Sequence, residues 1–317
     1  MTLIKKKILF FLSLILLNFI STTKTEANDE IKIVAKINNE IITNIDISYE
    51  YNYLIALNNN LKNISLNEGL LIAKDSLIRE KIKINELKRY FILENIDKKI
   101  TDEVLVNFYQ NLNLANEKDF SLYLNNYNLS LDNVREKIKI EILWNQLISR
   151  KFKDQININE ETLKNEIEEK NLDLTKSIEF DLSEIVFQAS NEIEFAEKIK
   201  QIKLSIENNG FNTSANKYSV SKTANFGGKI GKVEKNQLSD KIQKELEKIQ
   251  IGQYTNPINI AGGFLIIFIN DKIEITKKLS KEEILKNLIK FEKRKQLEQF
   301  SQIYFNKIKI NTQINET

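Results

Sequence analysis

The sequence predicts an α+β protein in which helical segments at both ends of the chain flank a smaller domain of strands and short helices. Apolar residues recur at helical spacing through most of residues 44–171 and again through 280–304. Between them, residues 180–187 and 264–269 are apolar, β-branched runs typical of buried strands. Four glycine-containing turns or helix ends, at Gly210, Gly227–Gly231, Gly252 and Gly262-Gly263, separate these two runs, which indicates a compact sheet domain.

Composition restricts the chemistry of the chain. Its 317 residues, 42% hydrophobic and 29% charged, are enough for two or three folded domains. Cysteine and histidine are both absent, which excludes disulfides, thiol nucleophiles, Ser-His-Asp triads and histidine zinc sites. We therefore expect no metal site and no cofactor.

Residues 1–27 have the pattern of a secretory signal peptide. Lys5-Lys6-Lys7 is a basic segment, residues 8–20 form an apolar segment, and Thr25-Glu26-Ala27 offers small residues at the cleavage positions. The apolar run is short for a membrane span, so we expect cleavage and no stable membrane insertion, with a retained anchor as the alternative. Without this segment the chain has equal numbers of basic and acidic residues, which gives no reason to expect nucleic-acid binding.

The residues after this segment predict a hairpin followed by a series of helices. Residues 31–37 and 40–42 alternate in polarity around an Asn38-Asn39 turn, and Thr43 with Asp46 matches a helix capping box. Ser130 is a predicted N-cap for a helix that ends near Phe152. The apolar positions of the successive helices are Leu70, Leu71, Ala73, Leu77, Ile78, Val104, Phe108, Leu112, Phe120, Leu131, Val134, Ile138, Ile142, Leu163 and Ile167.

The C-terminal segment predicts one long helix and a short strand. Ser280 and Glu283 match a second capping box, and apolar residues continue at helical spacing to Tyr304. Residues 308–312 alternate in polarity and predict a final strand.

The central domain resembles the parvulin type of peptidyl-prolyl cis-trans isomerase domain. The residues that carry the resemblance are Gly227-Gly228-x-x-Gly231, Gly252-x-x-x-x-Pro257 and Gly263-Phe264-x-Ile266-Ile267. The predicted hairpin and first helix, residues 34–46, resemble the opening of SurA-type periplasmic chaperones. That family folds its C-terminal helix onto the N-terminal helical module and pairs a last strand near the N-terminal hairpin.

The resemblance implies a helical core module completed by the C-terminal helix, with one parvulin-like α/β domain inserted. On this interpretation, residues 1–27 are the signal peptide, 28–176 the SurA-like N-terminal module, 177–276 the parvulin-like domain, and 277–317 the C-terminal helix and strand packed on the N-terminal module.

The resemblance also implies a proline-binding site whose polar groups are changed. The two family histidine positions fall on Glu184 and Leu265, and a family Cys or Asp position falls near Val220 or Ser221. Leu238, Ile242 and Phe264 match the apolar positions that face proline, although ordinary core packing explains them equally well. For Glu184, a strand-end position or a lysine partner is the alternative to a functional role, because an unpaired buried carboxylate is costly.

Two functions follow as hypotheses. The first is a periplasmic folding chaperone of a Gram-negative bacterium that binds unfolded polypeptides, in particular outer-membrane proteins, through apolar grooves. The alternative is an active parvulin-type isomerase that tolerates the loss of both histidines. The exported leader and the flanking helical modules favour the chaperone.

Overall fold

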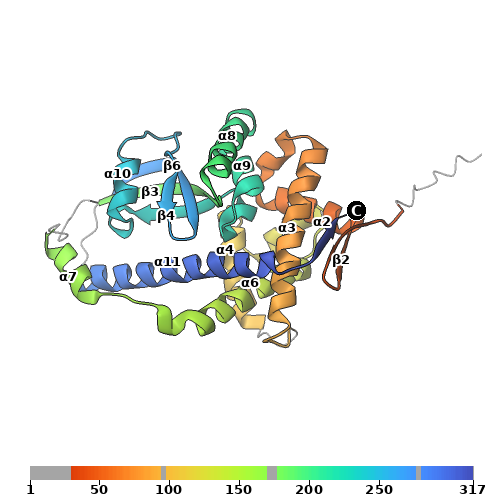
Figure 1. The fold of residues 1–317 in the computed structure, drawn as a ribbon, viewed down its shortest axis with the longest axis horizontal. Coiled ribbons are helices and arrows are strands. Elements are labelled where there is room, and N and C mark those ends of the chain that lie inside the picture. The colour runs from red at the N-terminus through yellow and green to blue at the C-terminus, as the bar shows by residue number, and fades with distance from the viewer. Residues whose placement is uncertain (1–29, 94–97, 170–176, 276–279, 317) are drawn as a thin grey trace, which may run out of the picture. The chain divides into compact units, whose positions relative to one another are not determined.

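A computed structural model describes residues 30–93, 98–169, 177–275 and 280–316 (Figure 1). The predicted signal peptide, residues 1–27, lies outside these described residues. From Ile33 onward the described residues form one compact unit that contains both the helical part and the sheet domain.

A three-stranded antiparallel sheet joins the two ends of this unit. Its strand order is β2-β1-β7, so the last strand pairs with the first, next to the predicted hairpin. Asn38 in the hairpin turn has a φ of 51°, a left-handed conformation that asparagine tolerates well. The strands are β1 (Ile33–Ile37), β2 (Glu40–Thr43) and β7 (Ile314–Glu316).

The prediction of a strand at residues 308–312 is wrong. The preceding helix continues to Ile310, and the strand begins only at Ile314. Three residues in which polarity alternates, Ile308 to Ile310, fit the end of an amphipathic helix as well as a strand, so the pattern alone could not separate the two.

The helical core is built from amphipathic helices whose starts are capped as predicted. The side chain of Thr43 accepts from the backbone N–H of Asp46 and the Asp46 carboxylate accepts in return, which confirms the first capping box; those at Ser130 and Ser280 also form. The helices are α2 (Asn44–Leu57), η2 (Asn59–Asn63), α3 (Leu66–Leu87), α4 (Lys98–Asn111), α5 (Glu117–Asn125), α6 (Leu131–Phe152), η3 (Lys153–Gln155), α7 (Glu160–Glu169) and α11 (Lys281–Ile310).

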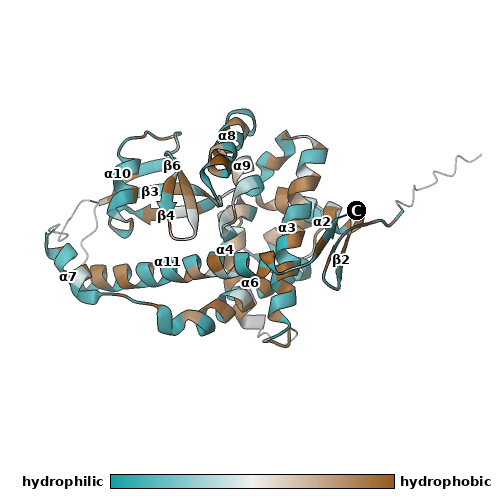
Figure 2. Cartoon of the chain, in the orientation of Figure 1, coloured by the Kyte–Doolittle hydropathy of each residue, from teal (hydrophilic) through white to brown (hydrophobic). Residues whose placement is uncertain are grey.

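Helix α11 lies against α3, α6 and α7, and its apolar and polar residues alternate along its length (Figures 1 and 2). Trp144 of α6 is buried against two α11 aromatic rings, those of Tyr304 at 5.9 Å and Phe305 at 6.2 Å between centroids. The indole N–H of Trp144 also donates to the hydroxyl of Ser301 at 2.8 Å. These contacts cover an apolar surface of α6 that would otherwise face water.

The sheet domain is one antiparallel sheet of order β4-β3-β6-β5, with a hydrophobic cluster on each face. Helices α8 and α9 cover one face, and the segment from η5 through α10 covers the other. Helix α9 was not predicted. The elements are β3 (Ser177–Phe187), α8 (Glu192–Asn209), α9 (Phe211–Tyr218), η4 (Lys222–Phe226), β4 (Lys229–Glu234), η5 (Lys235–Gln237), α10 (Asp240–Leu246), β5 (Ile258–Ile260) and β6 (Gly263–Ile275).

Within the described ranges, no helix is both long enough and apolar enough to cross a membrane.

Candidate functional site

The structure separates the three residues predicted to form the proline-binding cup. Leu238 and Ile242 belong to the cluster under η5 and α10, together with Leu265. Phe264 belongs to the cluster on the opposite face, where its ring lies 4.3 Å from that of Phe195. Adjacent residues of a strand point to opposite faces, so Phe264 and Leu265 cannot share one surface. The cup that includes Phe264 is therefore a wrong prediction.

Leu265, at one of the two family histidine positions, is a core residue. Its side chain is 7% exposed, and it lies opposite Val186 in the β3–β6 pairing, on the face that also bears Leu238. An apolar side chain at this place fills the sheet's core and provides no hydrogen-bonding group.

Glu184, at the other histidine position, is held by two hydroxyl groups. Ser221 donates to its carboxylate at 2.6 Å and Thr223 donates at 2.9 Å. Burial raises the pKa of Glu184, and these two hydrogen bonds oppose that rise only in part. The residue lies inside β3, and no described lysine forms an ion pair with it, so neither a strand-end position nor a described lysine partner explains it.

The two hydroxyls belong to a loop that is hydrogen-bonded to the backbone of β3. The Ser219 hydroxyl accepts from the backbone N–H of Val186 at 3.0 Å, and the Gly228 carbonyl accepts from that of Glu184 at 2.8 Å. Gly228 has a φ of 77°, and a Cβ atom there would lie 2.2 Å from the Glu184 carbonyl oxygen. This turn therefore requires glycine on both conformational and steric grounds.

The same loop contacts the helical core. The ring of Phe226 packs edge-on against Phe108 of α4 at 4.9 Å, and Lys222 forms an ion pair of 2.9 Å with Glu298 of α11. We call residues 219–228 the docking loop.

Helix α9 adds two polar contacts beside the docking loop. Asn58 donates to the side-chain carbonyl of the buried Asn216 at 2.6 Å, and Lys217 pairs with Glu68 at 2.6 Å. No local sequence pattern indicates this junction, because its partners are far apart in the chain.

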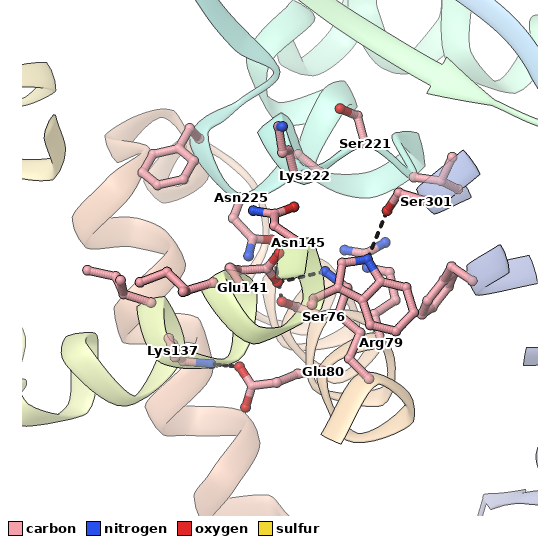
Figure 3. A pocket seen from close by; sticks show the side chains of 18 of the residues that line it. Ser76, Arg79, Glu80, Lys137, Glu141, Asn145, Ser221, Lys222, Asn225 and Ser301 are labelled. Atoms are coloured by element: carbon pink, nitrogen blue, oxygen red, sulfur yellow. Dashed lines mark hydrogen bonds and ion pairs between the residues drawn. The ribbon is translucent and has the colours of Figure 1, made fainter. Parts of the chain in front are cut away.

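A pocket of about 190 Å³ lies where the docking loop meets α3, α4, α6 and α11 (Figure 3). Lys137 on its wall forms ion pairs with Glu50 at 2.6 Å and Glu80 at 2.5 Å. Burial by itself would lower the pKa of Lys137, but the two carboxylates outweigh it and raise that pKa. The pocket is thus a polar, charged site within an apolar core. Of its lining residues, only Val220 and Ser221 were named from the sequence, as the place near which a family Cys or Asp position falls.

The described part of the chain contains no group of three or more Asp, Glu, His or Cys side chains that could hold a metal ion.

The structure thus has an antiparallel sheet domain that contacts a helical core through the docking loop and α9. Residues 178–271 match the family described as Rotamase, the PPIC-type PPIASE domain. Chaperone SurA of Pseudomonas putida is 26% identical over 163 residues, which are 49% of this chain and 38% of that protein. The chain therefore spans well under half the length of this curated relative.

Two solved structures are also similar. A PpiC-type peptidyl-prolyl cis-trans isomerase domain is 30% identical, covering 31% of this chain and 93% of that chain, with a TM-score of 0.28. A structure of the SurA-like chaperones of Campylobacter jejuni is 17% identical, covering 90% of this chain and 98% of that chain, with a TM-score of 0.37. The chain contains a PPIC-type domain and resembles SurA-type chaperones.

Proposed function

We propose that the chain is a folding chaperone for unfolded polypeptides, including outer-membrane proteins, and that its PPIC-type domain has a structural role in place of a catalytic one. The observation that carries this proposal is the environment of the two residues at the positions that the resemblance assigns to histidines. Leu265 is buried in the sheet's core, and Glu184 is bonded to Ser221 and Thr223 of the docking loop.

Isomerase catalysis needs groups that bind the twisted prolyl bond better than the planar one. The apolar residues on the Leu265 face, Leu238 and Ile242, provide shape but no such polar group. The Glu184 carboxylate has two hydroxyl partners already, and both of them fix the loop on which the junction depends. We therefore expect isomerisation by this chain near the uncatalysed rate.

The proposal includes the division of the chain into modules. Residues 28–176 and 277–317 are taken as one helical unit and residues 177–276 as the inserted domain, which the contacts of α11 with α3, α6 and α7 and the pairing of β7 with β1 support. We further propose export to the periplasm through cleavage of residues 1–27. N-terminal sequencing of periplasmic protein should then begin at Asn28, whereas full-length chain in the membrane pellet would replace export with anchoring.

An aggregation assay tests the chaperone role. A chemically unfolded β-barrel protein is diluted from denaturant, and light scattering is followed with the chain or with an equal mass of an inert folded protein. We expect the chain to suppress the light scattering strongly and the inert protein to leave it unchanged.

A parallel experiment with an unfolded helical soluble protein tests which class of client the chain prefers. Equal suppression of scattering for both clients would contradict the preference for outer-membrane proteins. Scattering equal to that with the inert protein for both clients would contradict the chaperone proposal.

A further inference from the structure

Arg79 on α3 is a charged side chain without a direct partner at the junction pocket. It lines the 190 Å³ pocket and also a neighbouring pocket of about 320 Å³ between α3, α11 and the sheet domain. The described residues provide it with no hydrogen bond and no ion pair, and no dashed line reaches it in Figure 3. Asp75 lies one helical turn earlier and attracts Arg79 electrostatically, but the two described side chains form no direct ion pair.

The other charged residues of this pocket are already paired. Lys83 pairs with Glu141 at 2.6 Å, Lys137 with Glu80 at 2.5 Å, and Lys222 with Glu298 at 2.9 Å. Burial lowers the pKa of Arg79, although a guanidinium group stays protonated at neutral pH. The carboxylates of Asp75, Glu50 and Glu141 attract Arg79 through space, but among the described residues none lies within ion-pair distance of it. An anionic ligand in direct contact would therefore stabilise the buried guanidinium further.

A second unpartnered group lines the same pocket. Gln302 of α11 is 7% exposed, and its side-chain carbonyl oxygen has no hydrogen-bond partner among the described residues. Buried amide groups are normally paired, and a glutamine side chain offers one acceptor and two donors, which complement a peptide backbone. Arginine and glutamine together can therefore bind an anion that belongs to a polypeptide.

Apolar side chains complete the pocket wall. The rings of Phe108, Trp144, Phe226 and Phe305 lie on it, so a peptide side chain would contact hydrocarbon beside the two polar groups. About 190 Å³ is small compared with typical cofactor pockets, and it suits one residue of a peptide. The carboxylates of Glu80, Glu141 and Glu298 nearby would repel a doubly charged phosphate more than a singly charged carboxylate.

We propose that this pocket binds a carboxylate group of an extended polypeptide, with Arg79 as its cationic partner and Gln302 bonding the adjacent peptide group. This inference rests on the proposed chaperone function and adds the chemistry by which one client residue is recognised. Because Val220, Ser221, Lys222 and Phe226 of the docking loop form one wall, the site is complete only when the sheet domain is docked.

The single tryptophan of the chain allows ligand binding at this pocket to be measured by fluorescence. Trp144 is the only tryptophan and it lines the pocket, so its fluorescence reports directly on occupancy. The full-length chain is titrated with three short alanine- and leucine-containing peptides, all N-acetylated: one with a free C-terminal carboxylate, one amidated, and one amidated with an internal glutamate. We expect one of the two carboxylate peptides to bind about tenfold tighter than the neutral peptide.

Variants assign the effect to the pocket. Arg79→Gln should abolish the preference for the carboxylate, while Arg89→Gln, the same change at an exposed arginine paired with Glu86, should leave it intact. Gln302→Leu fills the buried position with a side chain of similar size that needs no partner. This variant should bind all three peptides about three- to tenfold more weakly than the wild type, while its circular dichroism spectrum stays unchanged.

Equal affinity of the three peptides for the wild type would overturn the inference, as would a carboxylate preference that survives in Arg79→Gln. If Arg79→Gln does not fold, unchanged peptide affinities in Gln302→Leu would overturn it. If the wild-type chain suppresses client aggregation but shows no preference for carboxylate peptides, only this inference is contradicted. If the wild-type chain does not suppress aggregation, the chaperone proposal itself is contradicted.

Discussion

The hydroxyl of Ser221 donates a 2.6 Å hydrogen bond to the carboxylate of Glu184, and this contact links the sheet domain's central strand to the loop that docks on the helical core. The strand β3 supplies the acceptor, and the loop that follows α9 supplies the donor. The loop then continues to Phe226, which packs against Phe108. A position that the family resemblance assigns to a histidine therefore contributes here to the junction between the two parts of the chain.

The raised pKa of Glu184 predicts a particular pH dependence of stability. A carboxyl group whose pKa is higher in the folded than in the unfolded state binds its proton more tightly when folded, so its contribution to stability is greatest at low pH. That contribution should fall as the pH rises from about 4.5, the ordinary value, through the raised pKa, and level off above it.

Glu184→Gln tests this dependence, because glutamine keeps an oxygen acceptor for Ser221 and Thr223 but cannot titrate. Urea unfolding from pH 4 to pH 8 should show the variant gaining stability relative to the wild type as the pH rises. A constant difference between the two proteins across this range would mean that Glu184 does not titrate as its burial implies.

Gly228 should be far less tolerant of substitution than Gly231, although both have positive φ values. Gly228→Ala should cost about 2–4 kcal/mol of unfolding free energy, since its Cβ would meet the Glu184 carbonyl at 2.2 Å in addition to the backbone strain. Gly231 has φ 87° and open space around it, so Gly231→Ala should cost only about 1–2 kcal/mol. Equal losses in urea unfolding would show that the close approach of loop and strand is not maintained in solution.

The contact between Phe108 and Phe226 should appear as a coupling energy across the junction. Single and double alanine variants form a thermodynamic cycle that isolates the pair, and an edge-to-face aromatic contact of this kind contributes about 0.5–1.5 kcal/mol. Strict additivity in the cycle would mean that the docking loop does not rest on α4 in solution.

Helix α11 should stabilise the helical core through Phe305. This side chain is 8% exposed and lies against Trp144, so Phe305→Ala should cost about 3–5 kcal/mol and shift the tryptophan emission to longer wavelength. The matched change Ile310→Ala, at a residue that is 84% exposed on the same helix, should stay within about 0.5 kcal/mol of the wild type. Similar effects of the two variants would argue against packing of α11 on α6.

Features that depend on neighbouring residues could be predicted from the sequence. The capping boxes at Thr43 and Ser280 and the N-cap at Ser130 form as expected, because each joins residues three apart in the chain. The strands β3 and β6 likewise follow from short segments rich in apolar and β-branched residues.

Features that depend on residues far apart in the chain could not be predicted from the sequence. Asn58 and Asn216 meet across 158 positions of sequence, and neither position has a local pattern that indicates the other. The pocket around Arg79 combines residues of α3, α6, α11 and the docking loop for the same reason. Phe264 is a different case, because the alternation of side chains along β6 places it and Leu265 on opposite faces of the sheet, whereas the family resemblance predicts that Phe264 faces the proline site with Leu238 and Ile242.

The central claim, that the PPIC-type domain supports the junction and does not catalyse isomerisation, is tested most directly by a protease-coupled prolyl-peptide assay on protein that suppresses aggregation. We predict that cis-to-trans conversion proceeds at the uncatalysed rate, with a time constant of roughly tens to hundreds of seconds at 25 °C, at all concentrations of the chain. A rate that rises in proportion to the concentration of the chain, and that is lost when Leu238→Ser changes the apolar surface beside Leu265, would contradict the claim.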